Sequence, residues 1–409
     1  MFIFKANLMF VMRVNLRFIL IFCLVIIFQN KNLKAQNHDI DSYKFTHLKL
    51  LNVTPVKNQY NSSTCWSFSV ISMLESELLR LNKGNYDLSE MFIVRHVYPA
   101  KALKYVRMHG HIHFTAGGTP SDVTDMIKKY GIVPEYTYPA IKENLIYGQV
   151  DSLLKEYICS VISSENDKLS SDWYKDYLEI LDSYLGVPPD TFEIDSTTFT
   201  PKSFAEELGL DMNDYILITS YTHHPFYSKF ILEVPDNWSW SNVYNVPLDE
   251  LIEIIDSAVF NNYSVVWSAD ISEKGFSFAN GLAIIPEISY EAMDPEERAI
   301  WDTLPVEVKN KRIYNFNSPG IEKTITQEIR QEGFDNYSTT DDHGLHIVGI
   351  AEDQNKTKYY YVKNSWGIDN PYFGYMYVSE AYVKYKTMSI MLNKNAVPER
   401  IAKKLKHGI

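Results

Sequence analysis

The stretch that decides the fold reads Val53-Thr54-Pro55-Val56-Lys57-Asn58-Gln59-Tyr60-Asn61-Ser62-Ser63-Thr64-Cys65-Trp66-Ser67-Phe68. The polar residues before Cys65 disfavour a helix, whereas apolar residues after it recur at helical spacing. These apolar residues are Trp66, Val70, Leu74, Leu78 and Leu81. The pattern predicts a long amphipathic helix that begins at or next to Cys65, with Ser63 and Thr64 available to cap it.

A cysteine at the start of a helix has distinctive chemistry. The unpaired amides and the positive end of the helix favour thiolate over thiol, so we expect a lowered pKa for Cys65. The same amides can hydrogen-bond a developing oxyanion, and Gln59 on the approach loop offers a second donor. The alternative is a buried structural cysteine beside a core tryptophan, since free cysteine is often buried.

A second block lies near the other end of the chain. Residues 343–350, 358–363 and 372–378 alternate with period two and predict antiparallel strands. His343 begins the first of these strands, and Asn364 follows the second. Asparagine in that place can fix the orientation and tautomer of the imidazole while the other ring nitrogen faces a thiol. Trp366, two residues further on, would shield that hydrogen bond from water.

Composition excludes several classes of protein. The chain has 409 residues, 45% of them hydrophobic and 22% charged, which argues against a disordered or fibrous chain. The formal net charge of −12 disfavours nucleic acid or an anionic membrane surface as a partner. Of the three cysteines, Cys65 and Cys159 lie outside the N-terminal leader, too few for a disulfide scaffold. One disulfide between them is an open alternative, although we expect the Cys65 thiol to be free.

The N-terminus has the pattern of a secretory signal. Arg13 and Arg17 precede an apolar run over residues 18–28, and a polar stretch ends in Lys34-Ala35-Gln36. The apolar run is too short for a good transmembrane helix. We therefore expect removal of residues 1–35, one domain over residues 36–409, no stable membrane anchor, and a periplasmic or secreted location. An uncleaved anchor is the alternative, because Leu33 is larger than a cleavage site prefers.

Together these blocks resemble the papain family of cysteine peptidases. The resemblance rests on Gln59, Cys65-Trp66-Ser67-Phe68, His343 and Asn364-Ser365-Trp366-Gly367, which occur in the family's order. It implies an α+β, papain-like fold of two lobes, in which a helical lobe carries the cysteine and an antiparallel β lobe carries the histidine and asparagine. It also implies that Cys65, His343, Asn364 and Gln59 are catalytic, and that Gly117, Gly118 and Trp366 line the substrate groove.

Two histidines compete for the catalytic role. His343 and His346 are three residues apart, so they point to opposite faces of a strand. The family places its histidine six residues before a strand glycine, and Gly349 stands at that distance from His343. The resemblance therefore favours His343 over His346.

The bleomycin hydrolase, or aminopeptidase C, branch of the family is favoured by large insertions. Cys65 and His343 are separated by 278 positions, and we expect the insertions at roughly residues 140–340. The branch implies an aminopeptidase that acts on peptides without a cofactor, and a homo-oligomer, typically a hexamer. The chain ends where the family's C-terminal arm would begin, which leaves an endopeptidase with an open cleft as an alternative. A peptide-binding protein without catalysis is a third.

Metal binding is the remaining possibility for the site. His109, His111 and His113 would lie on one face if residues 109–113 formed a strand. Their neighbourhood in sequence has neither cysteine nor a cluster of carboxylates, so we expect an exposed loop and no metal site.

Overall fold

The computed structural model describes residues 42–139, 147–163, 168–288, 290 and 293–405. The chain divides into two compact units, one of Met1–Lys44 with Asn317–Pro319 and one of Phe45–Phe316 with Gly320–Ile409. The second unit carries the elements discussed below. The export signal predicted for residues 1–35 lies outside the described residues and stays a prediction. Among the described residues, no helix combines the length and the apolar character needed to cross a membrane.

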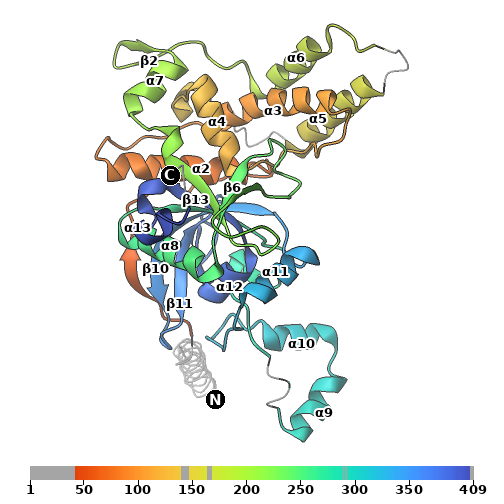
Figure 1. Ribbon diagram of the computed structural model, residues 1–409, viewed down its shortest axis with the longest axis vertical. Helices are drawn as coiled ribbons and strands as arrows, with labels where there is room; N and C mark the ends of the chain where they lie inside the picture. Colours follow the sequence, from red (N-terminus) through yellow and green to blue (C-terminus); the bar gives the residue numbers. More distant parts are fainter. Residues whose placement is uncertain (1–41, 140–146, 164–167, 289, 291–292, 406–409) are drawn as a thin grey trace, which may run out of the picture. The chain divides into compact units, whose positions relative to one another are not determined.

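The helical lobe is built around α2 (Cys65–Arg80), which begins at the cysteine as the apolar spacing predicted. α3 (Glu90–Arg107) begins after Ser89, whose hydroxyl accepts a hydrogen bond from the Phe92 N–H at 3.1 Å. It runs through Pro99 and ends at Arg107. The rest of the lobe, at the top of Figure 1, consists of α4 (Pro120–Tyr130), α5 (Tyr147–Ile162), α6 (Trp173–Leu185), the hairpin of β2 (Phe192–Ile194) and β3 (Thr197–Phe199), and α7 (Pro201–Leu208).

The β lobe is a mixed sheet. Its strand order among the described residues is β5-β6-β4-β13-β7-β10-β11-β12-β9-β8, and β1 also pairs with β10. The strands are β1 (Thr46–Leu50), β4 (Tyr215–Thr219), β5 (Lys229–Ile231), β6 (Asn242–Asn245), β7 (Val265–Ala269), β8 (Phe276–Ser277), β9 (Leu282–Ala283), β10 (His343–Glu352), β11 (Lys358–Lys363), β12 (Tyr375–Ser379) and β13 (Thr387–Asn393). The pairs β4–β6 and β9–β12 are parallel, so the expectation of a purely antiparallel lobe is wrong there.

The helices that follow α7 in the chain are α8 (Leu248–Phe260), α9 (Pro295–Thr303), α10 (Val306–Ile313), α11 (Gln327–Asp335), α12 (Glu380–Lys386) and α13 (Glu399–Ala402). Among them, α8 and α12 contact strands of the sheet, whereas α9 and α10 project away from it (Figure 1). β4 and β7 lie inside the range that we expected to be inserted, yet both pair with β13 in the middle of the sheet. The α+β, two-lobed fold predicted from the sequence is confirmed.

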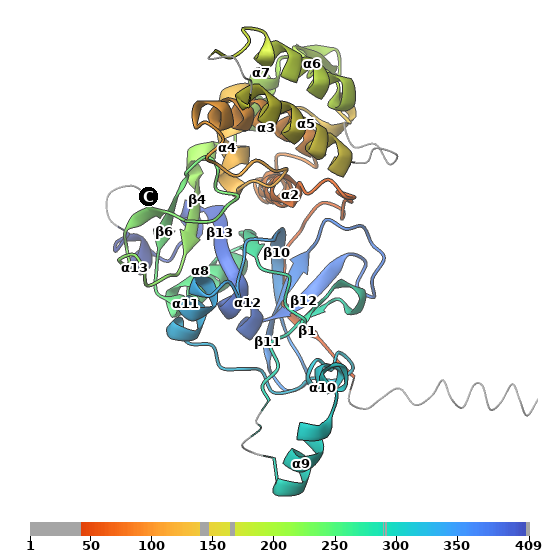
Figure 2. The ribbon, with the colours of Figure 1, turned by 90° about the vertical axis from the view of Figure 1, so that its right-hand side faces the viewer.

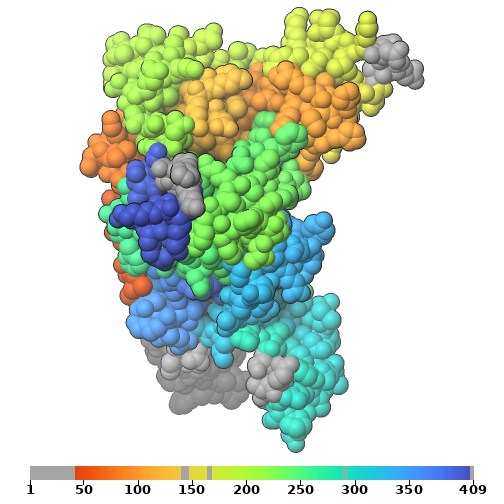
Figure 3. Space-filling model, viewed as in Figure 1, coloured from red at the N-terminus to blue at the C-terminus, as the bar shows by residue number. Residues whose placement is uncertain are grey.

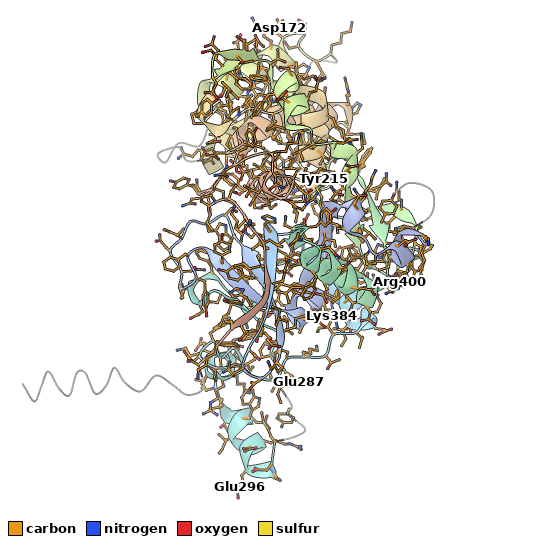
Figure 4. All side chains as sticks on the ribbon, turned by 90° about the vertical axis from the view of Figure 1, so that its left-hand side faces the viewer. Asp172, Tyr215, Glu287, Glu296, Lys384 and Arg400 are labelled. Atoms are coloured by element: carbon orange, nitrogen blue, oxygen red, sulfur yellow. The ribbon has the colours of Figure 1, made fainter. Side chains whose placement is uncertain are left out.

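The last described segment of the chain packs on the β lobe. Leu405 is 2% exposed in the core that also contains residues of α8. Arg400 lies beside α8 and forms ion pairs with Glu250 and Glu253 (Figure 4). In the space-filling view, the dark blue surface of this segment lies against the green surface that includes the neighbourhood of β4 and β6 (Figure 3).

The two lobes meet where α2 lies across the start of β10 (Figure 2). Side chains of β10 alternate between the faces of the sheet. Leu345 and Ile347 enter the β-lobe core. On the opposite face, His346 reaches Ser72 of α2, with 2.9 Å between its Nδ1 and the hydroxyl oxygen. This register leaves His343 at the edge of the interface, next to the first turn of α2.

Gly344 allows the close approach of the two elements. A Cβ atom at this position would lie 2.8 Å from the Ser69 hydroxyl oxygen and 3.1 Å from the carbonyl oxygen of Cys65. Backbone atoms cannot move aside without shifting the helix, so any larger side chain would push β10 away from α2.

We expect Gly344→Ala to destabilise the protein by about 1–3 kcal/mol, because the added methyl overpacks the interface. Urea unfolding measures the change, and a thiol-labelling assay of Cys65 reports whether the first turn of α2 has moved. Gly148→Ala in α5 is the matched control, since a Cβ there meets nothing within 4 Å. Equal stability of the two variants would contradict the role given to Gly344.

Candidate active site

Cys65 is the first residue of α2 and carries a free, partly exposed thiol. Thr64 occupies the capping position, but its side chain forms no hydrogen bond to the helix amides, so the predicted side-chain cap is wrong. Instead the Thr64 carbonyl oxygen accepts from the Ser67 N–H at 2.9 Å. The amides of the first turn are therefore not occupied by a capping side chain.

The pKa of the Cys65 thiol differs from the sequence expectation. Burial raises this pKa to about 12, and the negative charges of Asp341 and Asp236 act in the same direction. Hydrogen bonds from the backbone N–H groups of Gly344 and Trp66 oppose the rise without cancelling it. The prediction of a lowered pKa was wrong for this arrangement, because it counted the helix end and omitted the loss of water around the sulfur.

His343 is held from two sides. Its Nε2 lies 2.8 Å from the side-chain oxygen of Asn364, and its ring stacks on Trp366 with 4.6 Å between the centroids. Asn364 Oδ1 also accepts from the Ser365 N–H at 2.7 Å. Because this oxygen only accepts, the bond requires the ring proton on Nε2 and leaves Nδ1 as the acceptor. Burial lowers the pKa of His343 to about 4, so the ring is neutral.

Gln59 is oriented by a residue to which sequence reasoning gave no role. Its backbone N–H donates to the Ser365 carbonyl oxygen at 2.8 Å, and the Ser365 hydroxyl donates to Gln59 Oε1 at 2.6 Å. These bonds occupy the carbonyl end of the side chain and leave the amide NH₂ as a donor. The sequence feature that could have pointed to a role for Ser365 is its position between Asn364 and Trp366 in the quoted motif.

These side chains share one cavity of about 710 Å³ with the predicted groove residues. Cys65, His343, Gln59, Gly117, Gly118 and Trp366 all line it. A Cβ atom on Gly118 would lie 2.9 Å from the Trp66 ring, which explains the glycine there. The geometry thus brings together the residues from both ends of the chain that the sequence singled out.

The two histidines are separated as predicted. His346 is 1% exposed and lies between α2 and the sheet. Burial and the nearby Lys363 charge hold its pKa well below the usual range. His346 is therefore a neutral interior residue of the lobe interface and does not line the cavity that contains Cys65.

The structure also bears on two alternatives from the sequence, a disulfide and a metal site. Cys65 and Cys159 are both free, so the disulfide alternative is wrong. Residues 109–113 form turn and irregular structure, which removes the strand face that a metal site there required. Among the described residues, the group whose ligand atoms come close enough for a metal is instead His223, His224 and Glu233. Both imidazoles there already contact the Glu233 carboxylate, at 3.1 and 2.9 Å.

Family models match both halves of the site. The model of the papain family cysteine proteases matches residues 39–175, which include Gln59 and Cys65. The model of the Peptidase C1-like family matches residues 308–409, which include His343 and Asn364. The chain is a papain-like C1 cysteine peptidase.

Similar proteins place this C1 peptidase on the aminopeptidase C branch. It is 21% identical to Aminopeptidase G of Lactobacillus delbrueckii subsp. lactis, over 85% of this chain and 82% of that protein. It is 22% identical to Aminopeptidase W of the same organism, over 87% and 85% of the two chains. Aminopeptidase C of Lactococcus lactis subsp. cremoris is 21% identical, over 84% and 82%. The crystal structure of PepW from Lactobacillus rhamnosis matches with a TM-score of 0.63 and 18% identity, over 88% and 84%, and shows the shared fold.

The low pKa of His343 makes the stability of this C1 peptidase depend on pH. An unfolded histidine has a pKa of 6.5, whereas the folded residue has a pKa of about 4. Between these values the unfolded chain binds a proton that the folded chain does not, so stability is lost as the pH falls. Between pH 7 and pH 5 we expect the wild type to lose about 2 kcal/mol more unfolding free energy than His343→Ala.

Urea unfolding of both proteins at the two pH values measures this difference. An equal or smaller loss in the wild type would mean that the imidazole is charged in the folded protein, as in an ion pair with a Cys65 thiolate.

Proposed function

We propose that this peptidase uses Cys65 as its nucleophile, His343 as general base and acid, and Asn364 to orient the imidazole. One observation carries the proposal. Asn364 and Trp366 fix the ring of His343. The next residue, Gly344, donates its backbone N–H to the Cys65 sulfur, so the histidine lies beside the thiol. With Nε2 engaged by Asn364, Nδ1 is the nitrogen available to take the thiol proton.

The proposed reaction proceeds in two halves. His343 takes the thiol proton while the sulfur attacks the peptide carbonyl carbon, and the resulting oxyanion accepts hydrogen bonds from the Cys65 N–H and the Gln59 side-chain NH₂. The carbon–nitrogen bond then breaks as His343 gives its proton to the leaving amine. Water, deprotonated by the same ring, attacks the thioester, and the carbon–sulfur bond breaks to release the acid and restore the thiol. These steps require no cofactor.

A neutral resting pair fits this sequence of steps. Burial raises the pKa of Cys65 and lowers that of His343, so the uncharged forms dominate before substrate binds. Proton transfer within the pair then creates the nucleophile next to the carbonyl that it attacks. Donors already in place for the oxyanion stabilise the charge that develops, without the reorganisation that water would need.

We further propose that the substrate is the N-terminal residue of a peptide, as in aminopeptidases of the bleomycin hydrolase type. The similar proteins named above are aminopeptidases, and this supports the same reaction here.

An endopeptidase is the second candidate, and one observation favours it. The described segment from Glu399 to Leu405 packs on α8 and does not line the cavity. That segment therefore does not close the cleft against longer peptides.

Two coumarylamide substrates, leucyl and N-acetyl-leucyl, test the proposal with the wild type and Cys65→Ala. We expect rapid cleavage of the free substrate by the wild type, a rate at least about tenfold lower for the acetylated one, and cleavage of neither by Cys65→Ala. An epoxide inhibitor of thiol proteases should label the wild type at residue 65.

Comparable cleavage of both substrates would exclude an aminopeptidase and select the endopeptidase. Full activity of Cys65→Ala would end the proposed mechanism. Peptide binding without cleavage or labelling would leave only a binding protein.

We also propose that the protein is exported, from the pattern of residues 1–35 alone. The expected result is a mature chain that begins near residue 36 in the cell envelope or the medium, as measured by mass spectrometry of its N-terminal peptide. A cytoplasmic chain that retains residues 13–28 would contradict export.

A further inference from the structure

A loop from the β lobe is fixed on the helical lobe beside the cleft. It comprises residues 232–241, between β5 and β6, and we call it the β5–β6 loop. The Trp238 indole N–H donates to the Asp122 carboxylate of α4 at 2.9 Å, and the Trp238 side chain is 6% exposed. Lys104 of α3 lies over the Trp240 ring at 3.6 Å. The loop is therefore held on α3 and α4, two helices that lie far from it in the sequence.

The loop is also rigid by itself. The Asn237 side-chain NH₂ donates to the carbonyl oxygens of Leu232 and Ser241, both at 3.0 Å, and its oxygen accepts from the Ser241 N–H at 2.9 Å. These bonds tie the two ends of the loop together. Asp236, the residue before Asn237, is consequently held in a defined position.

Asp236 occupies the space directly over Gly117, one of the two groove glycines. A Cβ atom on Gly117 would lie 2.0 Å from the Asp236 carboxylate, so the two residues pack more closely than any side chain on residue 117 would permit. Thr115 Oγ1 donates to Asp236 Oδ1 at 3.3 Å, and His113 Nδ1 lies 3.4 Å from the same oxygen. Asp236 lines the cavity that contains Cys65.

A second carboxylate faces the same space without a partner. Asp341 precedes His343 by two residues and lines the cavity. None of the hydrogen bonds or ion pairs found among the described residues involves its side chain. Burial and the negative charges of Asp236 and Asp342 raise the pKa of Asp341 to about 7. Asp341 is partly exposed to the cavity. A carboxylate that loses water without gaining a partner is costly, and a cation placed between Asp236 and Asp341 would relieve that cost.

We propose that Asp236 and Asp341 bind the ammonium group at the N-terminus of the substrate, so that the first peptide bond lies over Cys65. The inference rests on the cysteine-peptidase function proposed above and deepens it by assigning the residues that select a free N-terminus.

The position of Asp236 favours the N-terminal ammonium group of a peptide as the cation that binds here. In an extended substrate, the residue before the scissile one would run along Gly117 and Gly118 and pair with their backbone. The Asp236 carboxylate takes up room over Gly117, so we infer that an ammonium group is accepted there in place of a further peptide unit. An ammonium group offers three donors, and charge-assisted bonds to two carboxylates are the strong kind. A lysine side chain one residue upstream would present the same chemistry, so the experiment must separate the two sources.

The experiment compares the wild type with Asp236→Asn, Asp341→Asn and Asp125→Asn on three coumarylamide substrates: leucyl, N-acetyl-leucyl and N-acetyl-lysyl-leucyl. Asp125 is an exposed residue of α4 and serves as the matched control. For Asp236→Asn and Asp341→Asn we expect kcat/KM on the leucyl substrate to fall about tenfold or more, mainly through KM, because a charged hydrogen bond is lost. The preference for the free over the acetylated substrate should fall with it, and Asp125→Asn should keep both values.

Alkylation of Cys65 by iodoacetamide, which has no ammonium group, checks that each variant retains an accessible thiol. An unchanged preference for the free substrate in both cleft variants would overturn the inference, while Cys65-dependent cleavage would leave the proposed function standing. The inference would also be overturned if N-acetyl-lysyl-leucyl were the best substrate and lost most in the variants, since the carboxylates would then bind a basic side chain. Loss of cleavage and of labelling already in the wild type would refute the peptidase mechanism, and the inference with it.

Discussion

The structure depends on how closely α2 can lie against β10. The first residue of the helix brings the sulfur, and the first residue of the strand brings the imidazole. Where the helix and the strand meet, residue 344 must be glycine, because even a methyl group there would crowd the Cys65 carbonyl oxygen. Every other part of the site is arranged around this contact. Asn364 comes from the end of the neighbouring strand β11, and Gln59 from the loop that leads into α2.

Burial in the cleft disfavours the thiolate and the imidazolium, which are the charged groups that the proposed reaction must form. The thiol and the imidazole both favour their neutral forms, and two carboxylates close to the sulfur oppose a thiolate further. A cation that neutralises Asp236 and Asp341 would remove this opposition. Binding of the substrate ammonium would then lower the cost of forming the thiolate, so that recognition and activation would be linked through the same two side chains.

The sequence predicted the parts of the site that rest on local pattern. The helix start at Cys65 and the strand over residues 358–363 follow from apolar spacing and appear at those positions. His343 was separated from His346 by strand alternation, and the register of β10 bears this out. These predictions succeeded because neighbours in sequence decide them.

What the sequence did not reveal depends on contacts between distant residues. Asp236 lies in a loop that has no recognisable motif and meets Gly117 across 119 positions, so spacing carried no signal of the contact. The thiol pKa was predicted in the wrong direction because burial is a property of the assembled cleft. The predicted cap failed for a similar reason, since the Thr64 hydroxyl pairs with Ser62 at 2.5 Å rather than with the helix.

The anchoring of the β5–β6 loop has a consequence for how this architecture can diversify. The loop joins the edge strand β5 to its neighbour β6, and the bonds that hold it involve neither α2 nor β10. Its length can therefore change over generations without disturbing the sheet register, whereas a change that moves Asp236 also alters the charge around the thiol. If Asp236 recognises the substrate as proposed, substrate range and thiol reactivity would change together in this molecule, and a shortened hairpin would open the cleft to the interior of longer chains.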